Sequence, residues 1–253
     1  MLHQLKKWAG LSPPVEWRCG KIRQRDLLQT VGRGSVSTLT LFHRGEPVWT
    51  RDVSLQLHEF TCHCLEYLLS PPPWPLPPVT PATAQAPDAA ESSHLPASIS
   101  EALRVKRRWI RGQADTGDLQ RAAAVVETDT RTWWPSSFCF GINALVSAGM
   151  CVGEAMNLER PGYSAAQCAR CVAEYFAQIG ACSLLKCDES GEESPGMNPD
   201  GQTPGIAVRS VACPHLDEPR LQKQAGRSLN PVRNEWWAQL NHELSEIVAS
   251  PEI

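Results

Sequence analysis

Cysteine has the widest chemical repertoire of the residue types in this chain, because thiolates bind metals and act as nucleophiles. Six of the ten cysteines lie in local groups, namely Cys62-His63-Cys64, Cys168 with Cys171, and Cys182 with Cys187. A structural zinc site takes four such ligands, so Cys168, Cys171, Cys182 and Cys187 form a candidate site. Cys168 and Cys171, however, lie three residues apart among Ala and Val in an expected helix. We favour small thiols buried in a core and predict no metal.

The sequence has no recognisable signature of catalysis. It lacks a G-x-S-x-G elbow, a Walker A loop and an H-E-x-x-H zinc motif. The short Gly32-Arg33-Gly34 run is not a phosphate-binding loop, and the histidines are scattered without an acidic partner at a recognisable spacing. We therefore expect a protein that is not an enzyme and that has no cofactor.

Aromatic and acidic residues form the most distinctive candidates for a binding surface. Two pairs of adjacent tryptophans occur, and adjacent residues on a helix point about 100° apart, so one of each pair is a candidate anchor and burial of all four is the alternative. An acidic segment rich in Gly and Pro adds charge that would speed association with a basic partner. The predicted binding residues are Trp133, Trp134, Trp236, Trp237, Asp188, Glu189, Glu192 and Glu193.

The elements before residue 98 are expected to form a small α+β unit. Alternating apolar residues at 36–42 and 48–53, separated by a turn-like stretch, predict a hairpin. A helix with Ser54 as its cap should follow and run to Leu69, and Ile22–Leu28 is expected to form a short helix or strand. The dense prolines of Pro71–Pro87 predict a linker over 70–97, which serves as a spacer or, in a second interpretation, as a strip for a Pro-recognising module.

The rest of the chain predicts an Ala-rich helical bundle over 98–187. The expected helices are one from about Ser98 that ends at Gly112, one from Asp115 or Thr116 to Trp134, one over Phe138–Leu158, and one capped by Ser164 that ends at Gly180. An acidic Gly/Pro-rich region follows at 188–229, and a last helix over 230–253 should begin at Asn230-Pro231. The predicted fold class is α+β, mainly α-helical.

Charge and composition exclude several classes of protein. The chain of 253 residues has 24 Lys and Arg against 27 Asp and Glu, a net charge of −3, so direct nucleic-acid binding through a basic excess is not expected. The basic stripe Arg104, Lys106, Arg107, Arg108 and Arg111 beside Trp109 is better explained as the solvated face of an amphipathic helix. Without an export signal or an apolar span in the sequence, we expect a cytoplasmic protein that does not contact membranes.

The helical region resembles a known family. The stretch ALRVKRRWIRGQADTGDLQRAAAVVETDTRTWW, with the Ala-rich helices up to AAQCARCVAEYFAQIG, is similar to the helical immunity proteins of bacterial polymorphic toxin and type VI secretion systems. In that family a helix that ends in a W-x-x-G pattern precedes Ala-rich helices, and here the pattern is Trp109-Ile110-Arg111-Gly112. The similarity covers about a third of the chain.

The resemblance implies a cytoplasmic protein that binds a cognate secreted toxin and neutralises it by stoichiometric occlusion. Because nucleases present basic clefts, the acidic segment and the tryptophans indicate a nuclease effector as the partner. The alternative is a zinc-stabilised, nucleic-acid-associated regulatory protein that uses the Cys pairs and the basic helix. An enzyme of unrecognised type is a third interpretation.

Overall fold

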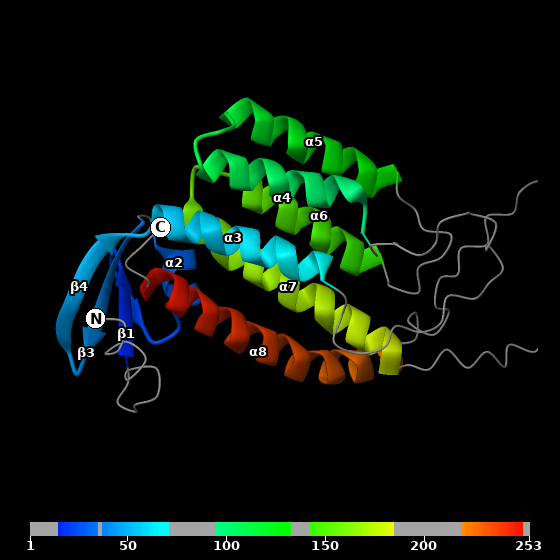
Figure 1. Ribbon diagram of the computed structural model, residues 1–253. Coiled ribbons are helices and arrows are strands. Elements are labelled where there is room, and N and C mark those ends of the chain that lie inside the picture. The colour runs from blue at the N-terminus through cyan, green and yellow to red at the C-terminus, as the bar shows by residue number, and fades with distance from the viewer. Residues whose placement is uncertain (1–14, 35–36, 71–94, 133–141, 185–218, 250–253) are drawn as a thin grey trace, which may run out of the picture.

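The protein combines a small antiparallel sheet with a larger set of helices, as Figure 1 shows. The computed structural model describes residues 15–34, 37–70, 95–132, 142–184 and 219–249. The strands are β1 (Val15–Cys19), β2 (Ile22–Gln24), β3 (Thr38–His43) and β4 (Glu46–Asp52). The helices are α2 (Leu27–Arg33), α3 (Ser54–Leu69), α4 (Ala97–Ile110), α5 (Thr116–Thr132), α6 (Ile142–Met156), α7 (Pro161–Leu184) and α8 (Pro219–Ala249). The predicted α+β, mainly helical class is confirmed.

The four strands form one sheet in the order β2-β1-β3-β4, with every neighbouring pair antiparallel. The expected hairpin is β3 and β4, joined by Arg44 and Gly45, whose φ angles of 52° and 86° suit a two-residue turn. Thr40 and Thr50 face each other across it and share a hydrogen bond of 2.9 Å. Strand β1 is not among the elements expected from the sequence, and β2 occupies the first part of Ile22–Leu28, which we expected to form a short helix or strand.

Three helix starts differ from the sequence prediction. Ser54 does not cap α3, because Asp52 Oδ1 accepts the Ser54 N–H at 2.7 Å and the Ser54 hydroxyl at 2.5 Å. Helix α7 begins at Pro161, a residue suited to the first turn, and Ser164 Oγ donates instead to Glu154 on α6 at 3.3 Å. Helix α8 begins at Pro219, so Pro231 lies inside the helix and not at its start.

Helix α4 ends where the sequence predicts. The chain leaves the helix at Arg111, and Gly112 has a φ of 71°, a left-handed conformation that glycine adopts without a steric cost. The Gly112 N–H donates to Trp109 O at 2.9 Å, and the Gln113 N–H donates to Arg108 O at 2.8 Å. The W-x-x-G pattern therefore has a structural role here, as the end of a helix.

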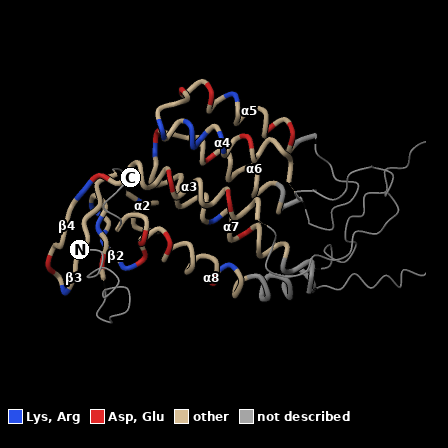
Figure 2. Tube along the Cα trace, viewed as in Figure 1, with Lys and Arg blue, Asp and Glu red and all other residues tan. Residues whose placement is uncertain are grey.

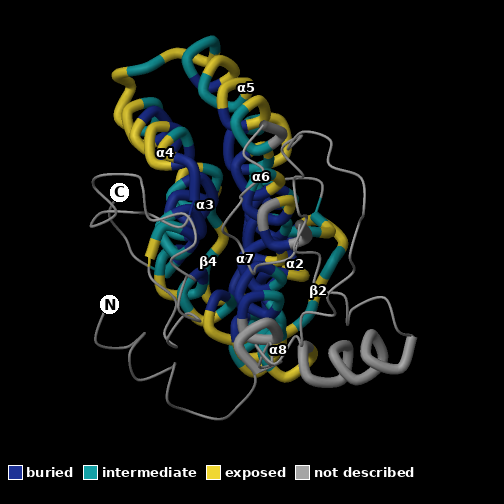
Figure 3. Tube along the Cα trace, turned by 90° about the vertical axis from the view of Figure 1, so that its right-hand side faces the viewer, coloured by how far each residue is buried: buried dark blue, intermediate teal, exposed yellow. Residues whose placement is uncertain are grey.

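Helix α7 lies at the centre of the molecule and is buried along most of the length whose side chains are described (Figure 3). It packs against α2, α3, α6 and α8. One main apolar cluster joins Leu39 of the sheet to Phe60 of α3, Phe176 of α7 and Leu240 of α8. Described residues of both 1–69 and 98–187 contribute to this cluster. The Pro71–Pro87 segment between them lies outside the described residues, and the division of the chain into separate units stays a prediction.

Two glycines allow α2 to lie directly against α7. A Cβ atom at Gly32 would meet Ala166 Cβ at 2.6 Å, and one at Gly162 would meet Val31 O at the same distance. Both separations are shorter than any van der Waals contact. Glycine on each helix is thus the condition for this close approach, which fixes the position of α2 on α7.

None of the helices that the structure describes is both long and apolar enough to cross a bilayer.

Candidate functional site

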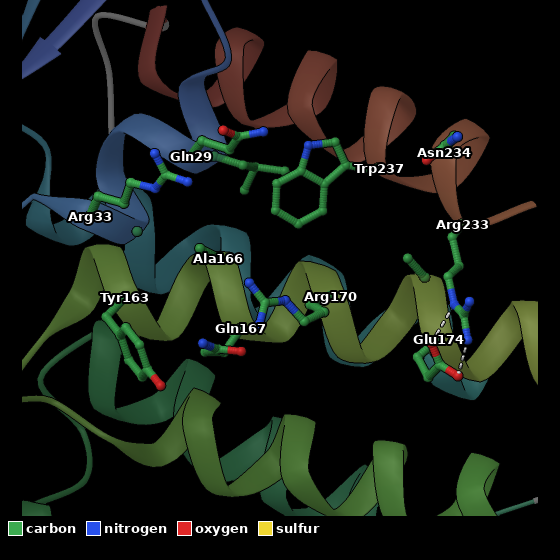
Figure 4. Close-up of a pocket in the computed structure, with 13 residues that line it drawn as sticks. Gln29, Arg33, Tyr163, Ala166, Gln167, Arg170, Glu174, Arg233, Asn234 and Trp237 are labelled. Atoms are coloured by element: carbon green, nitrogen blue, oxygen red, sulfur yellow. Dashed lines mark hydrogen bonds and ion pairs between the residues drawn. The ribbon is translucent and has the colours of Figure 1, made fainter. Parts of the chain in front are cut away.

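A groove with a volume of about 590 Å³ lies where α2, α7 and α8 meet (Figure 4). We call it the α2–α7–α8 groove. Its lining includes three arginines, two glutamines, a tyrosine and a tryptophan. The residues that line it are Leu28, Gln29, Gly32, Arg33, Tyr163, Ala166, Gln167, Arg170, Ala173, Glu174, Arg233, Asn234 and Trp237.

Helix α7 forms the floor of the groove. Tyr163, Gln167, Arg170 and Glu174 follow one another at spacings of four, three and four residues, so they lie along one face of the helix. At 1.5 Å per residue this polar stripe is roughly 16 Å long. The opposite face of α7 carries core residues such as Phe176, which is buried. The groove therefore lies on the amphipathic boundary of the central helix.

The two walls, α2 and α8, are joined at the N-terminus of α2. Asp26 caps α2 by accepting the Gln29 N–H at 2.8 Å through Oδ1, and its Oδ2 accepts the Trp237 Nε1–H at 2.8 Å. Asn241 Oδ1 accepts the Leu28 N–H at 2.9 Å. The Leu28 and Gln29 N–H groups are among those that a helix leaves free in its first turn. The bond to Asp26 holds the Trp237 indole at the groove.

One end of the groove is neutralised by a bidentate ion pair. Arg233 on α8 donates to Glu174 on α7 through Nε at 2.5 Å and through Nη2 at 2.7 Å, and Gln178 Nε2 donates to the same carboxylate at 2.6 Å. The hydrogen bonds from Arg233 lower the pKa of Glu174 and outweigh the opposing effect of burial. Both carboxylate oxygens of Glu174 are thereby occupied.

The other end of the groove keeps a positive charge. Arg33 on α2 and Arg170 on α7 are exposed, and within the described residues neither guanidinium forms a hydrogen bond or an ion pair. Tyr163 stands beside this end, with the Arg160 guanidinium 4.7 Å from its ring centroid. The groove thus has a neutral end at Glu174 and a cationic end at Arg33 and Arg170.

A second chemically unusual group is Lys106, which is completely buried between α3 and α4. Its Nζ lies 3.3 Å from His58 Nδ1 and 4.5 Å from the centroid of the Trp109 ring, but no described carboxylate pairs with it. Burial lowers the pKa of Lys106 to about 8, and burial together with the Lys106 charge lowers that of His58 to about 3. The expectation that Lys106 belongs to a solvated basic face is wrong.

The spacing of residues along α4 explains why Lys106 is buried. Ile99, Leu103 and Lys106 share one stripe of α4, and the stripe faces α3. The other basic residues of α4 are exposed, as expected: Arg104 pairs with Glu101 at 2.7 Å, and Arg107 pairs with Glu66 of α3. Figure 2 shows the Lys and Arg positions along α4.

The predicted tryptophan anchors have different surroundings. Trp236 is buried and stacks on Phe176, with centroids 4.1 Å apart and planes 6° apart, and Tyr67 meets it edge-on at 5.3 Å. Trp237 is half-buried and lines the groove. Trp133 and Trp134 lie outside the described residues, as do Asp188, Glu189, Glu192 and Glu193. Contact of these residues with a toxin stays a prediction.

The candidate zinc ligands are described only in part. Cys168 and Cys171 are buried on α7, whereas Cys187 and the side chain of Cys182 lie outside what the structure describes. Cys168 Sγ points to Cys151 O at 3.4 Å, and Cys151 Sγ points to Cys168 O at 3.8 Å. Across the described residues no group of three or more His, Cys, Asp and Glu side chains is arranged to hold a metal ion.

Arg33, Arg170, Glu174 and Arg233 are not among the site residues predicted from the sequence. A signal was present, because Tyr163, Gln167, Arg170 and Glu174 form a regular polar stripe on a helix that is otherwise rich in Ala, Cys and Val. The other two helices of the groove, α2 and α8, lie far from α7 and from each other in the sequence, so no local pattern places them beside this stripe.

Comparison with known proteins identifies no relative of this chain. It matches no protein-family model, no curated protein and no solved structure.

Proposed function

We propose that this protein is an immunity protein that binds a cognate secreted bacterial toxin and neutralises it by stoichiometric occlusion, without catalysis. The observation that supports the proposal best is the α2–α7–α8 groove, a concave surface built from Arg, Trp and Tyr side chains. In protein–protein interfaces, the residues that contribute most of the binding energy are enriched in these three types.

Preorganisation of the groove also favours binding of a partner protein. The Asp26 carboxylate holds the Trp237 indole, and the two glycine contacts fix α2 on α7. A surface that is ordered in advance loses less conformational entropy on association, so more of its contact energy appears as affinity. Within this proposal, Trp237 is the aromatic anchor of the interface, and Trp236 stabilises the core beneath it.

The proposal of a nuclease as the target rests on a different part of the chain. Its basis is the acidic run Asp188, Glu189, Glu192 and Glu193, which would complement a basic cleft. The groove carries the opposite charge at Arg33 and Arg170. The toxin is therefore expected to present both basic and acidic surfaces to this protein.

Co-expression with the toxic product of the adjacent gene tests the proposal. A stoichiometric inhibitor should restore growth in proportion to its own level. The variant Gln167→Trp places a large side chain in the groove, because Gln167 lines it from α7, and should abolish rescue. Gln120→Trp is the matched control, since Gln120 is exposed on α5 and does not line the groove.

Each outcome of this experiment is informative once circular dichroism shows that both variants are folded. Full rescue by Gln167→Trp would exclude the groove as the binding surface. Rescue by the wild type at levels far below those of the toxin would contradict stoichiometric neutralisation and indicate an enzyme that modifies the toxin.

A further inference from the structure

The cationic end of the α2–α7–α8 groove has two arginines whose charge no described carboxylate neutralises. Two carboxylates on the helices around the groove are already engaged: Glu174 accepts hydrogen bonds from Arg233 and Gln178, and Asp26 accepts from Trp237 and the first turn of α2. Neither can turn toward Arg33 or Arg170 without losing these bonds. The positive charge is therefore available to a group from outside the described residues.

We propose that Arg33 and Arg170 form a carboxylate-binding site that receives an acidic segment of the partner protein. This inference rests on the proposed function, in which the groove binds a protein. The arginine guanidinium is planar and carries N–H groups in a fork that matches a carboxylate. Because the two arginines stand on different helices, they can bind two carboxylates of one segment.

The shape of the groove favours a peptide segment over a small anion. The polar stripe on α7 is roughly 16 Å long, which corresponds to about five residues of extended chain. Gln29 on α2 and Gln167 on α7 also line the groove and offer both donors and acceptors to peptide groups, and Trp237 adds an aromatic surface from α8 (Figure 4). A small anion would use only the arginines.

The charge asymmetry of the groove predicts how the segment lies in it. Acidic side chains should bind at the end marked by Arg33, Arg170 and Tyr163, where the net charge is positive. Beyond Arg170, the Glu174 carboxylate repels further acidic residues unless Arg233 shields it. The remaining part of the segment should therefore be neutral.

Binding of synthetic acetylated hexaglutamate to the full chain tests this inference. The signal to follow is the indole N–H resonance of Trp237, identified in the nitrogen-15 spectrum by its loss in Trp237→Phe. We expect hexaglutamate to shift this resonance, and the double variant Arg33→Gln/Arg170→Gln to bind at least about tenfold more weakly. Hexaglutamine and inorganic pyrophosphate are the comparison ligands.

A matched double variant separates specific binding from general attraction. Arg44→Gln/Arg111→Gln removes the same charge from two exposed arginines outside the groove and should leave the affinity for hexaglutamate unchanged. An equal loss of affinity in both double variants would show bulk electrostatics and overturn the site. Pyrophosphate that binds as tightly as hexaglutamate would overturn the peptide assignment and indicate a phosphate site.

The test of the carboxylate site and the test of toxin neutralisation can fail independently of each other. If hexaglutamate fails to bind while the wild type still neutralises the toxin, the carboxylate site is wrong and toxin neutralisation stands. If hexaglutamate binds as expected but co-expression gives no rescue, the groove binds acidic segments of a partner that is not this toxin.

Discussion

Lys106 shows how an amphipathic pattern can conceal a buried charge. The side chain has no carboxylate partner within the described residues, and its nearest polar neighbour is His58, whose own pKa is lowered to about 3. Two titratable groups thus share one buried site, and burial disfavours the charged form of each. A cation at the face of Trp109 recovers part of this cost.

Replacement of Lys106 by Met should stabilise the fold at neutral pH. Unfolded chains keep the lysine proton up to about pH 10.5, whereas the folded chain releases it near pH 8. The wild type therefore carries a cost of about 3 kcal/mol below pH 8, which is relieved as the pH rises to 10.5. We expect Lys106→Met to raise the free energy of unfolding by about 1–3 kcal/mol at pH 7.

Urea denaturation at pH 7 and at pH 10 measures this difference. The advantage of Lys106→Met should shrink at pH 10, because the wild-type lysine is then neutral in the folded state. Ionisation of the thiols away from Lys106 is common to both proteins and cancels in the comparison, whereas Cys62 and Cys168 interact with the Lys106 charge. Lys21→Met, at an exposed position, is the control and should change little. An advantage that does not depend on pH would show that packing, and not charge, limits the wild type.

At the scale of the elements, the contact between α2 and α7 depends on Gly162, which has no side chain. Gly162→Ala would place Cβ 2.6 Å from Val31 O, a backbone atom that cannot move aside cheaply. Overpacking of this kind costs about 1–3 kcal/mol, although alanine returns up to about 1 kcal/mol of helix propensity. We expect a net loss of about 1–2 kcal/mol in thermal or urea unfolding.

Helix α6 offers a matched glycine for this experiment. Gly153 is exposed, and a Cβ there meets no atom within 4 Å. Gly153→Ala should therefore raise the free energy of unfolding by about 0.5–1 kcal/mol. If both alanine variants stabilise the protein, the close approach of α2 to α7 is not the constraint that we infer.

The elements also show how far local sequence can predict this fold. The hairpin, the end of α4 at Gly112 and the existence of the later helices follow from alternation, turn residues and helical periodicity. The starts of α3 and α7 do not, because Asp52 competes with Ser54 and a tertiary contact to Glu154 engages Ser164. The groove is harder still to predict from the sequence, because Trp237 and Asp26 are 211 residues apart and no local pattern connects them.

At the scale of the whole molecule, the shared core predicts that the two parts of the chain stay together after cleavage. Helix α3 belongs to the first part, yet it packs against α4, α6 and α7 of the second. A site for a sequence-specific protease, inserted within Pro71–Pro87, should be cut without separating the fragments. Their co-elution in size-exclusion chromatography would confirm this, whereas two separate peaks would show two autonomous units.

The buried thiols also make transient opening of the molecule observable under native conditions. The six cysteines whose side chains the structure describes are all buried and form no disulfide, and burial raises the pKa of Cys62 and of Cys171 to about 12. An alkylating reagent at neutral pH can therefore modify these thiols only while the surrounding helices are apart. Cys19 reports on the sheet, Cys62 on α3 and Cys151 on the contact of α6 with α7. The order in which mass spectrometry finds them modified gives the order in which these regions open.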